Sequence, residues 1–103
     1  MSSQVSNMKI RDLVNHKRAE ILNLAHKNGA FNVRIFGALL RDEEDANSQI
    51  DFLVELEPDR TLLDWVGLKQ GLEELLEHEI HLADVNGLPD RFRDLIVKEA
   101  IPL

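Results

Sequence analysis

Three segments of the chain carry apolar residues at the spacing of a helix that buries one face. In the first segment the apolar positions are Ile10, Leu13, Val14, Ile21, Leu24 and Ala25. The pair Asn28-Gly29 is a typical helix end, so one helix is predicted to stop there. The second predicted helix begins after Thr61, and Asp64, three residues further on, completes a capping-box pattern with it. Its stripe is Leu62, Trp65, Val66, Leu68, Leu72, Leu75 and Leu76. The third is predicted to begin with Pro89 as its first helical residue and to run to about residue 100.

Three shorter segments have the alternation and the β-branched or aromatic content of strands. They are "FNVRIF" (31–36), "IDFLVEL" (50–56) and "EIHLADV" (79–85). The polar residues 1–7 are expected to be flexible, and residues 37–48 are expected to form a polar loop. The element order α-β-β-α-β-α predicts an α/β or α+β fold, with a small mixed sheet flanked by helices.

Composition limits the class of protein. The chain has 103 residues, enough for a single domain spanning 1–103, with 44% hydrophobic and 30% charged residues. It has no cysteine, which excludes disulfides and thiolate metal sites. No run of eighteen apolar residues is present, so no membrane association is expected, and a cytoplasmic location is the simplest interpretation. The net charge of -7 argues against direct nucleic-acid binding.

The stretch "FGALLRDEEDANSQIDFLVEL" has the outline of a catalytic motif: a strand, a glycine, a polar loop, and a strand carrying an acid. With "EELLEHEIHLADVNGL" and "RFRDLIVKEAIPL" it resembles the minimal nucleotidyltransferases (MNT type) of the DNA polymerase β superfamily. The family motif is Gly-Ser, then Arg-Gly, then Ser-Asp-x-Asp on the next strand. The resemblance covers nearly the whole chain and implies the nucleotidyltransferase, polymerase β-like fold.

The chemistry of the family explains its motif. Nucleotidyl transfer moves a nucleoside monophosphate from a triphosphate to a hydroxyl, and two Mg²⁺ ions stabilise the attacking and leaving oxygens. Two aspartates two positions apart on a strand point to the same face, and a third carboxylate comes from the neighbouring strand. The Gly-Ser turn offers backbone N–H groups to the phosphates. The resemblance therefore implies Mg²⁺ and ATP as cofactors.

The phosphate-binding part of the motif is only partly kept. Gly37, Arg41 and Ser48 match the family, and with Ala38 they are the predicted nucleotide-binding residues. Ala38 stands where the family has a serine hydroxyl, and Asp42 stands where a glycine is usual. Asp42 also adds a negative charge where phosphates would lie, so these changes oppose nucleotide binding.

The metal-binding positions differ more. Gln49 replaces the first aspartate, Asp51 matches the second, and counting back from "NGL" places the third carboxylate position on His81. Gln49 offers only a neutral oxygen, and the nitrogen of His81 suits zinc or nickel better than magnesium. Asp51 is thus predicted to be a vestigial metal ligand and catalytic residue. His81 itself is better explained as a strand residue than as a ligand, because a zinc site needs at least three protein ligands. Asp84 is expected on the opposite face.

Three functions follow from the resemblance and from its departures. MNT proteins are commonly encoded beside HEPN-domain RNases and act as their antitoxins. The first hypothesis is therefore a catalytically impaired, inactive or weak transferase that binds and neutralises a HEPN-family RNase toxin. The alternative is an active metal-dependent nucleotidyltransferase that transfers AMP from ATP to a protein or small-molecule hydroxyl. The third is a structural homo-oligomer whose pocket serves no reaction.

Overall fold

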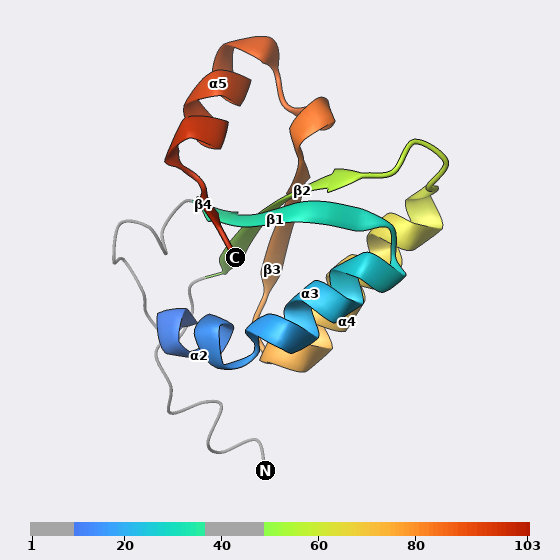
Figure 1. Cartoon of the computed structure of the whole chain (residues 1–103), viewed down its shortest axis with the longest axis vertical. Coiled ribbons are helices and arrows are strands. Elements are labelled where there is room, and N and C mark those ends of the chain that lie inside the picture. The colour runs from blue at the N-terminus through green and yellow to red at the C-terminus, as the bar shows by residue number, and fades with distance from the viewer. Residues whose placement is uncertain (1–9, 37–48) are drawn as a thin grey trace.

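The computed structural model describes residues 10–36 and 49–103, without the side chain of Ile10. The elements along the chain are α2 (Ile10–His16), α3 (Arg18–Lys27), β1 (Ala30–Phe36), β2 (Ile50–Leu56), α4 (Leu62–Leu76), β3 (Ile80–Asp84), the 3₁₀ turn η2 (Val85–Gly87), α5 (Asp90–Glu99) and β4 (Ile101–Pro102) (Figure 1). No helix in these described ranges is long and apolar enough to span a bilayer.

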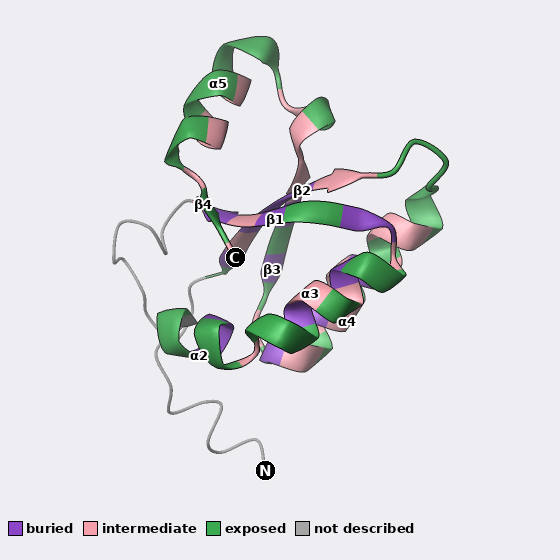
Figure 2. Cartoon of the chain, viewed as in Figure 1, coloured by how far each residue is buried: buried purple, intermediate pink, exposed green. Residues whose placement is uncertain are grey.

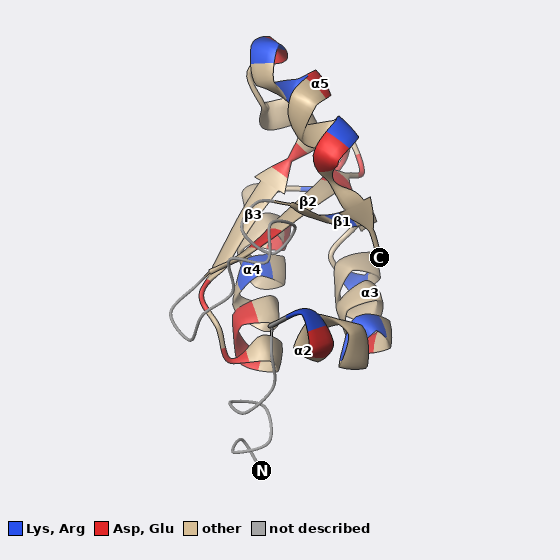
Figure 3. Ribbon diagram, turned by 90° about the vertical axis from the view of Figure 1, so that its left-hand side faces the viewer, with Lys and Arg blue, Asp and Glu red and all other residues tan. Residues whose placement is uncertain are grey.

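The strands form one mixed sheet in the order β3-β2-β1-β4. β1 pairs antiparallel with β2 and with β4, whereas β2 and β3 are parallel. Helix α4 makes the crossover that a parallel pair requires. Helices α2, α3 and α4 lie on one side of the sheet and α5 on the other, as two perpendicular views show (Figures 1 and 3). The predicted small mixed sheet flanked by helices is confirmed.

The main core lies between the sheet and helices α2 to α4 (Figure 2). The alternating residues Ile50, Phe52 and Val54 of β2 point into it and are at most 1% exposed. Helix α4 contributes Leu68, Leu72 and Leu76, which recur at helical spacing and are equally buried. Because β2 is central and its even-numbered residues face this core, its odd-numbered residues, including Asp51, face the other side of the sheet.

The second face of the sheet is less well covered. Leu53 of β2 is fully buried there and lies outside the main core cluster. Helix α5 contains no buried residue, and Phe92 and Leu95 are about half exposed. Arg93 links the start of α5 to the segment before it. Its guanidinium donates hydrogen bonds to the backbone oxygens of Val85 (3.1 Å) and Leu88 (2.9 Å).

Three details differ from the sequence predictions. The predicted single first helix bends at Lys17 into α2 and α3, because charged Lys17 and Arg18 interrupt the apolar stripe. Pro89 is the residue before α5 and not its first helical residue. Strand β4 was not predicted, since two residues are too few to show alternation. It pairs Ile101 and Pro102 with β1 at the edge of the sheet, where a proline is tolerated.

The predicted start of α4 is confirmed, and it makes a pH-dependent contribution to stability. Asp64 accepts a hydrogen bond from the backbone N–H of Thr61 (3.0 Å), and Arg60 lies 3.5 Å away. The Thr61 bond, followed by the charge of Arg60, lowers the pKa of Asp64 from its ordinary 3.8. A carboxyl with a lowered folded-state pKa stabilises the fold above its unfolded pKa and loses that contribution as the pH falls through the folded value.

We therefore expect Asp64→Asn to lower the urea midpoint at pH 7 and to make a smaller difference at pH 3, which lies below the unfolded-state pKa of 3.8. The difference between wild type and variant isolates Asp64 from the other carboxylates, which titrate in both proteins. Added salt should shrink the pH 7 difference, because the side chain of Asp64 is 28% exposed and Arg60 is screened. An equal difference at both pH values would contradict this role.

Candidate functional site

One row of side chains crosses three strands on the face opposite α3 and α4. The register of β1 and β2 places Phe36 opposite Asp51, and the parallel register of β2 and β3 places Asp51 opposite His81. Residues facing each other across adjacent strands lie within contact distance on the same face. The Phe36–Asp51–His81 row is therefore assembled by strand pairing alone.

Within this row Asp51 and His81 are bonded to each other. Nδ1 of His81 lies 2.9 Å from Oδ1 of Asp51. An ionised carboxylate can only accept a hydrogen bond, so the Nδ1–H of the imidazole donates to it. The Asp51 side chain is only 13% exposed, whereas that of His81 is 53% exposed. The aspartate is thus shielded by its neighbours while the imidazole is open to ligands.

Phe36 closes the other side of the row. Its ring centroid lies 6.2 Å from that of His81, with the two planes tilted by 57°. Sequence reasoning did not identify Phe36 as part of the site. The available signal was its position as the last strand residue before Gly37. The Phe36 ring limits water access beside Asp51. The hydrogen bond between Asp51 and His81 is therefore stronger than it would be in open water.

Gln49 precedes β2 and is exposed. It lies two residues before Asp51, with the fully buried Ile50 between them, so strand alternation places it on the face of the row. The predicted nucleotide-binding residues Gly37, Ala38, Arg41 and Ser48, with Asp42 to Asp45, lie outside the described residues. The phosphate-binding half of the site therefore stays a prediction.

The described residues do not fit a pair of Mg²⁺ ions. Mg²⁺ takes hard oxygen ligands in octahedral geometry, and two ions need several carboxylates. In residues 10–36 and 49–103, no three His, Asp or Glu side chains cluster as a metal site. Asp51 is bonded to His81, and the carboxylate of Asp84 instead accepts from the backbone N–H of Asn86 (3.0 Å). These two ranges of the chain therefore lack the set of carboxylates that a magnesium pair requires.

Comparison with known proteins identifies the family. The model of the nucleotidyltransferase domain matches residues 17–103. A Methanocaldococcus jannaschii protein, MJ0435, described provisionally as a protein adenylyltransferase, is 35% identical over 88 residues, 85% of this chain and 95% of that protein. The protein adenylyltransferase MntA of Thermococcus cleftensis is 27% identical over 89 residues, 86% of each.

Solved structures agree with this result. A structure described provisionally as a minimal nucleotidyltransferase is 39% identical, with a TM-score of 0.85 over 94% of this chain and 98% of that one. A toxin–antitoxin complex with AMP-PNP has a TM-score of 0.69 at 20% identity, over 82% and 69%, and shares the fold. The chain belongs to the nucleotidyltransferase domain family, as an MNT-type member of the polymerase β superfamily.

Proposed function

We propose that this chain is a catalytically impaired MNT-type antitoxin that binds a HEPN-family RNase and neutralises it by contact. The observation that carries the proposal is the 2.9 Å bond between Asp51 and His81. In an active transferase of this family, the position of His81 would hold a metal-binding carboxylate. Here the same position holds a side chain that occupies the carboxylate of Asp51.

The loss of metal ligands explains why transfer would be weak. Gln49 and His81 remove two negative charges from the position where two cations would bind. An Asp51 oxygen already bonded to an imidazole must break that bond before it can coordinate magnesium. Since removal of one ligand is enough to weaken a metal site by orders of magnitude, loss of two leaves little transferase activity.

A partner surface that does not depend on this chemistry is available at the start of α4. Leu62 and Leu63 are 74% and 82% exposed, and Val66 is 39% exposed. The exposed acids Glu57 and Asp59 lie just before them in the chain. The hydrogen bonds of the Thr61–Asp64 cap hold this turn in one conformation, so little entropy would be lost on binding.

The charge of this surface favours an RNA-cleaving partner. An enzyme that cleaves RNA needs a basic surface to bind phosphates. The apolar centre is bordered by Asp59 and by Glu57, which is ion-paired with Arg60 at 3.1 Å. The net charge of -7 makes the chain as a whole complementary to such a surface. We refer to Leu62, Leu63 and Val66, with Glu57 and Asp59, as the α4 surface.

The test is RNA cleavage by the HEPN-family RNase encoded beside this chain, with and without the purified protein. The RNase is first mixed with the nucleotide-free protein in EDTA, and cleavage is then measured. Inhibition under these conditions, unchanged in Asp51→Asn, supports the proposal. Inhibition that requires ATP and a divalent metal, and is lost in Asp51→Asn, supports the active transferase. Absence of an RNase gene beside this chain would contradict both functions. A stable homodimer of this chain that leaves the RNase active would contradict them as well.

The active transferase has one specific argument in its favour, which is that both curated relatives are named as protein adenylyltransferases. It would transfer AMP from ATP to a hydroxyl of the RNase or of a small molecule. The phosphate-binding loop and a rearranged metal site would have to supply what Gln49 and His81 lack. The EDTA arm separates the two functions, because contact needs no metal and adenylyl transfer does.

Leu63→Glu is expected to weaken binding to the RNase by about 30-fold or more, as for a residue at the centre of an interface. The substitution places a charge where an apolar contact would form, and the fold should be unaffected because the side chain is 82% exposed. Leu95→Glu on α5 is the matched control, since it makes the same change at a half-exposed leucine away from the α4 surface. Affinity for the RNase is measured by calorimetry. An equal loss of affinity in the two variants would rule out the α4 surface as the binding site.

A further inference from the structure

We propose that two copies of this chain pair through α5, with the two helices antiparallel and a two-fold axis beside Leu95. Among the described residues, the exposed large apolar side chains are Phe31, those of the α4 surface, and those of α5 and β4. Helix α5 therefore carries apolar residues that neither the core nor the α4 surface accounts for. The inference rests on α5 alone and not on the antitoxin function.

The outer side of α5 is uncovered in the single chain. Arg93, Ile96 and Val97 recur at helical spacing and are half-buried, so this side of the helix faces the sheet. Phe92 and Leu95 lie outside that group and are 44% and 54% exposed. The helix stands at one end of the molecule, away from helices α2 to α4 (Figures 1 and 3). Its outer side is thus free to meet another molecule.

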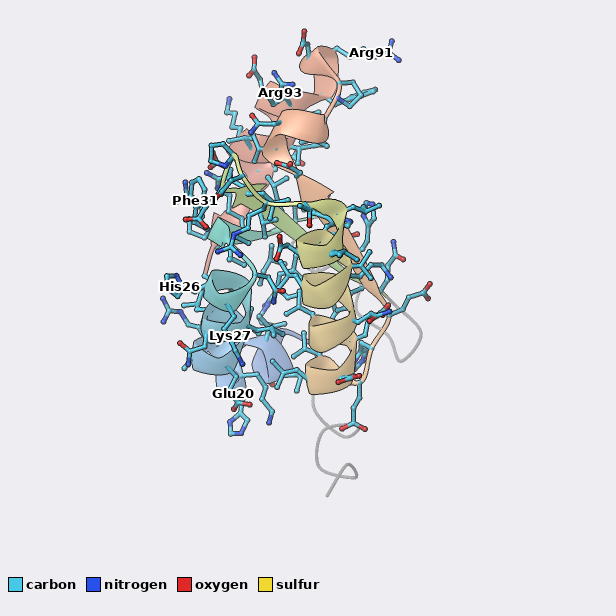
Figure 4. All side chains as sticks on the ribbon, turned by 90° about the vertical axis from the view of Figure 1, so that its right-hand side faces the viewer. Glu20, His26, Lys27, Phe31, Arg91 and Arg93 are labelled. Carbon is cyan, nitrogen blue, oxygen red and sulfur yellow. The ribbon has the colours of Figure 1, made fainter. Side chains whose placement is uncertain are left out.

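The charges on this outer side run from positive to negative along the helix. Arg91, Leu95 and Glu99 are four residues apart and form one row, with a cation at one end and an anion at the other. The Arg91 guanidinium lies over the Phe92 ring, 4.8 Å from its centroid, at the outer end of α5 (Figure 4). Neither Arg91 nor Glu99 has an ion-pair partner among the described residues. Both charges therefore remain available for a second molecule.

This row is complementary to itself when one copy is turned around. Leu95 is midway between Arg91 and Glu99, so antiparallel pairing about Leu95 brings Arg91 of each copy opposite Glu99 of the other. The two Leu95 side chains meet at the axis, with the Phe92 rings beside them. Parallel pairing would place like charges together and is disfavoured. A patch that complements itself across a two-fold axis is what an isologous dimer requires.

The charge of α5 favours a second copy over a basic partner. The helix is neutral overall, with three basic and three acidic residues, whereas a phosphate-binding enzyme presents a basic surface. One helix face per copy makes a small interface, below about 1,200 Å² in total, so we expect a dissociation constant weaker than about 10 μM. The α4 surface stays exposed in such a dimer and can still bind the RNase.

The experiment is sedimentation equilibrium of the purified chain over a wide range of protein concentration, at low salt. We expect a reversible monomer–dimer equilibrium that weakens as salt is added, because the ion pairs are exposed. Leu95→Glu should weaken the dimer by about 30-fold or more, since the residue is changed in both copies at the axis. Leu63→Glu is the matched control, because it makes the same change on the α4 surface and should leave the dimer intact.

Exchange of the two charges tests the antiparallel arrangement. Arg91→Glu alone and Glu99→Arg alone should each weaken the dimer by about tenfold, because the attraction at both ends becomes repulsion. An equimolar mixture of these two variants should form a heterodimer as tight as the wild-type dimer, since each end then pairs opposite charges. Both residues are exposed, so circular dichroism should show an unchanged fold.

Three results would overturn the proposal. They are a monomer at every concentration, a dimer that persists in Leu95→Glu, and a mixture of the charge variants that pairs no better than either variant alone. The RNase takes part in none of these measurements. Failure of the α5 dimer is therefore recorded separately from failure of the antitoxin function.

Discussion

Replacing both Gln49 and His81 by aspartate should give the chain Mg²⁺ binding at least about 100-fold tighter than wild type. The double variant would place two new carboxylates on the face of Asp51 and remove the imidazole that is bonded to it at 2.9 Å. Two carboxylates on the paired strands β2 and β3, with a third just before β2, are the hard oxygen set that Mg²⁺ requires. Calorimetric titration with MgCl₂, alone and with ATP, measures the gain.

The control must add the same charge elsewhere. Gln70→Asp with His26→Asp also replaces one glutamine and one histidine by aspartate, at exposed positions of α4 and α3. Any increase in Mg²⁺ affinity that comes only from the more negative overall charge would appear in this control as well. If the site variant keeps its secondary structure and melting temperature but binds Mg²⁺ no better than the control, Gln49 and His81 do not stand at metal-ligand positions.

Phe52→Ala is expected to lower the free energy of unfolding by about 3–5 kcal/mol. Phe52 is fully buried at the centre of β2, so its removal leaves a cavity between the sheet and helices α2 to α4. A domain of this size has a total stability of about 5–15 kcal/mol, so the loss is a large part of the whole. Urea unfolding followed by circular dichroism gives the value.

Phe92→Ala is the matched control for this substitution. Phe92 is 44% exposed on α5, and Arg91 lies over its ring at 4.8 Å. We expect Phe92→Ala to lower the free energy of unfolding by less than about 1 kcal/mol, as for a surface position with few buried contacts. Similar losses for the two phenylalanines would mean that α5 is packed as firmly as the main core, which its lack of buried residues argues against.

The sequence was sufficient for elements that carry a strong local signal. Strand β2 has the predicted bounds 50–56, and α4 begins after Thr61 because the cap with Asp64 is a local interaction. The helix end at Gly29 is also confirmed, with a φ of 75° that favours glycine. The bend at Lys17 was missed because the apolar positions on both sides of Lys17 and Arg18 keep helical spacing. Strand β4 was missed because two residues are too few to show alternation, and its pairing with β1 is a long-range contact that no local pattern records.

The residues of the candidate site also divide into those placed by a local pattern and those placed by strand pairing. That Asp51 and Gln49 share one face follows from strand alternation. The bond between Asp51 and His81 depends on the register of two strands that are 30 residues apart in the chain, and register is set by the core and not by the motif. Phe36 was missed for the same reason, since only the pairing of β1 with β2 places it opposite Asp51.

The segment that contains α5 joins the two edges of the sheet. It leaves after β3, which is one edge strand, and returns as β4, which is the other. Helix α5 makes up most of this connection and has no buried residue of its own (Figure 1). The two residues of β4, Ile101 and Pro102, cover part of the outer edge of β1. Loss of that pairing would leave this edge of β1 open to pairing with another molecule.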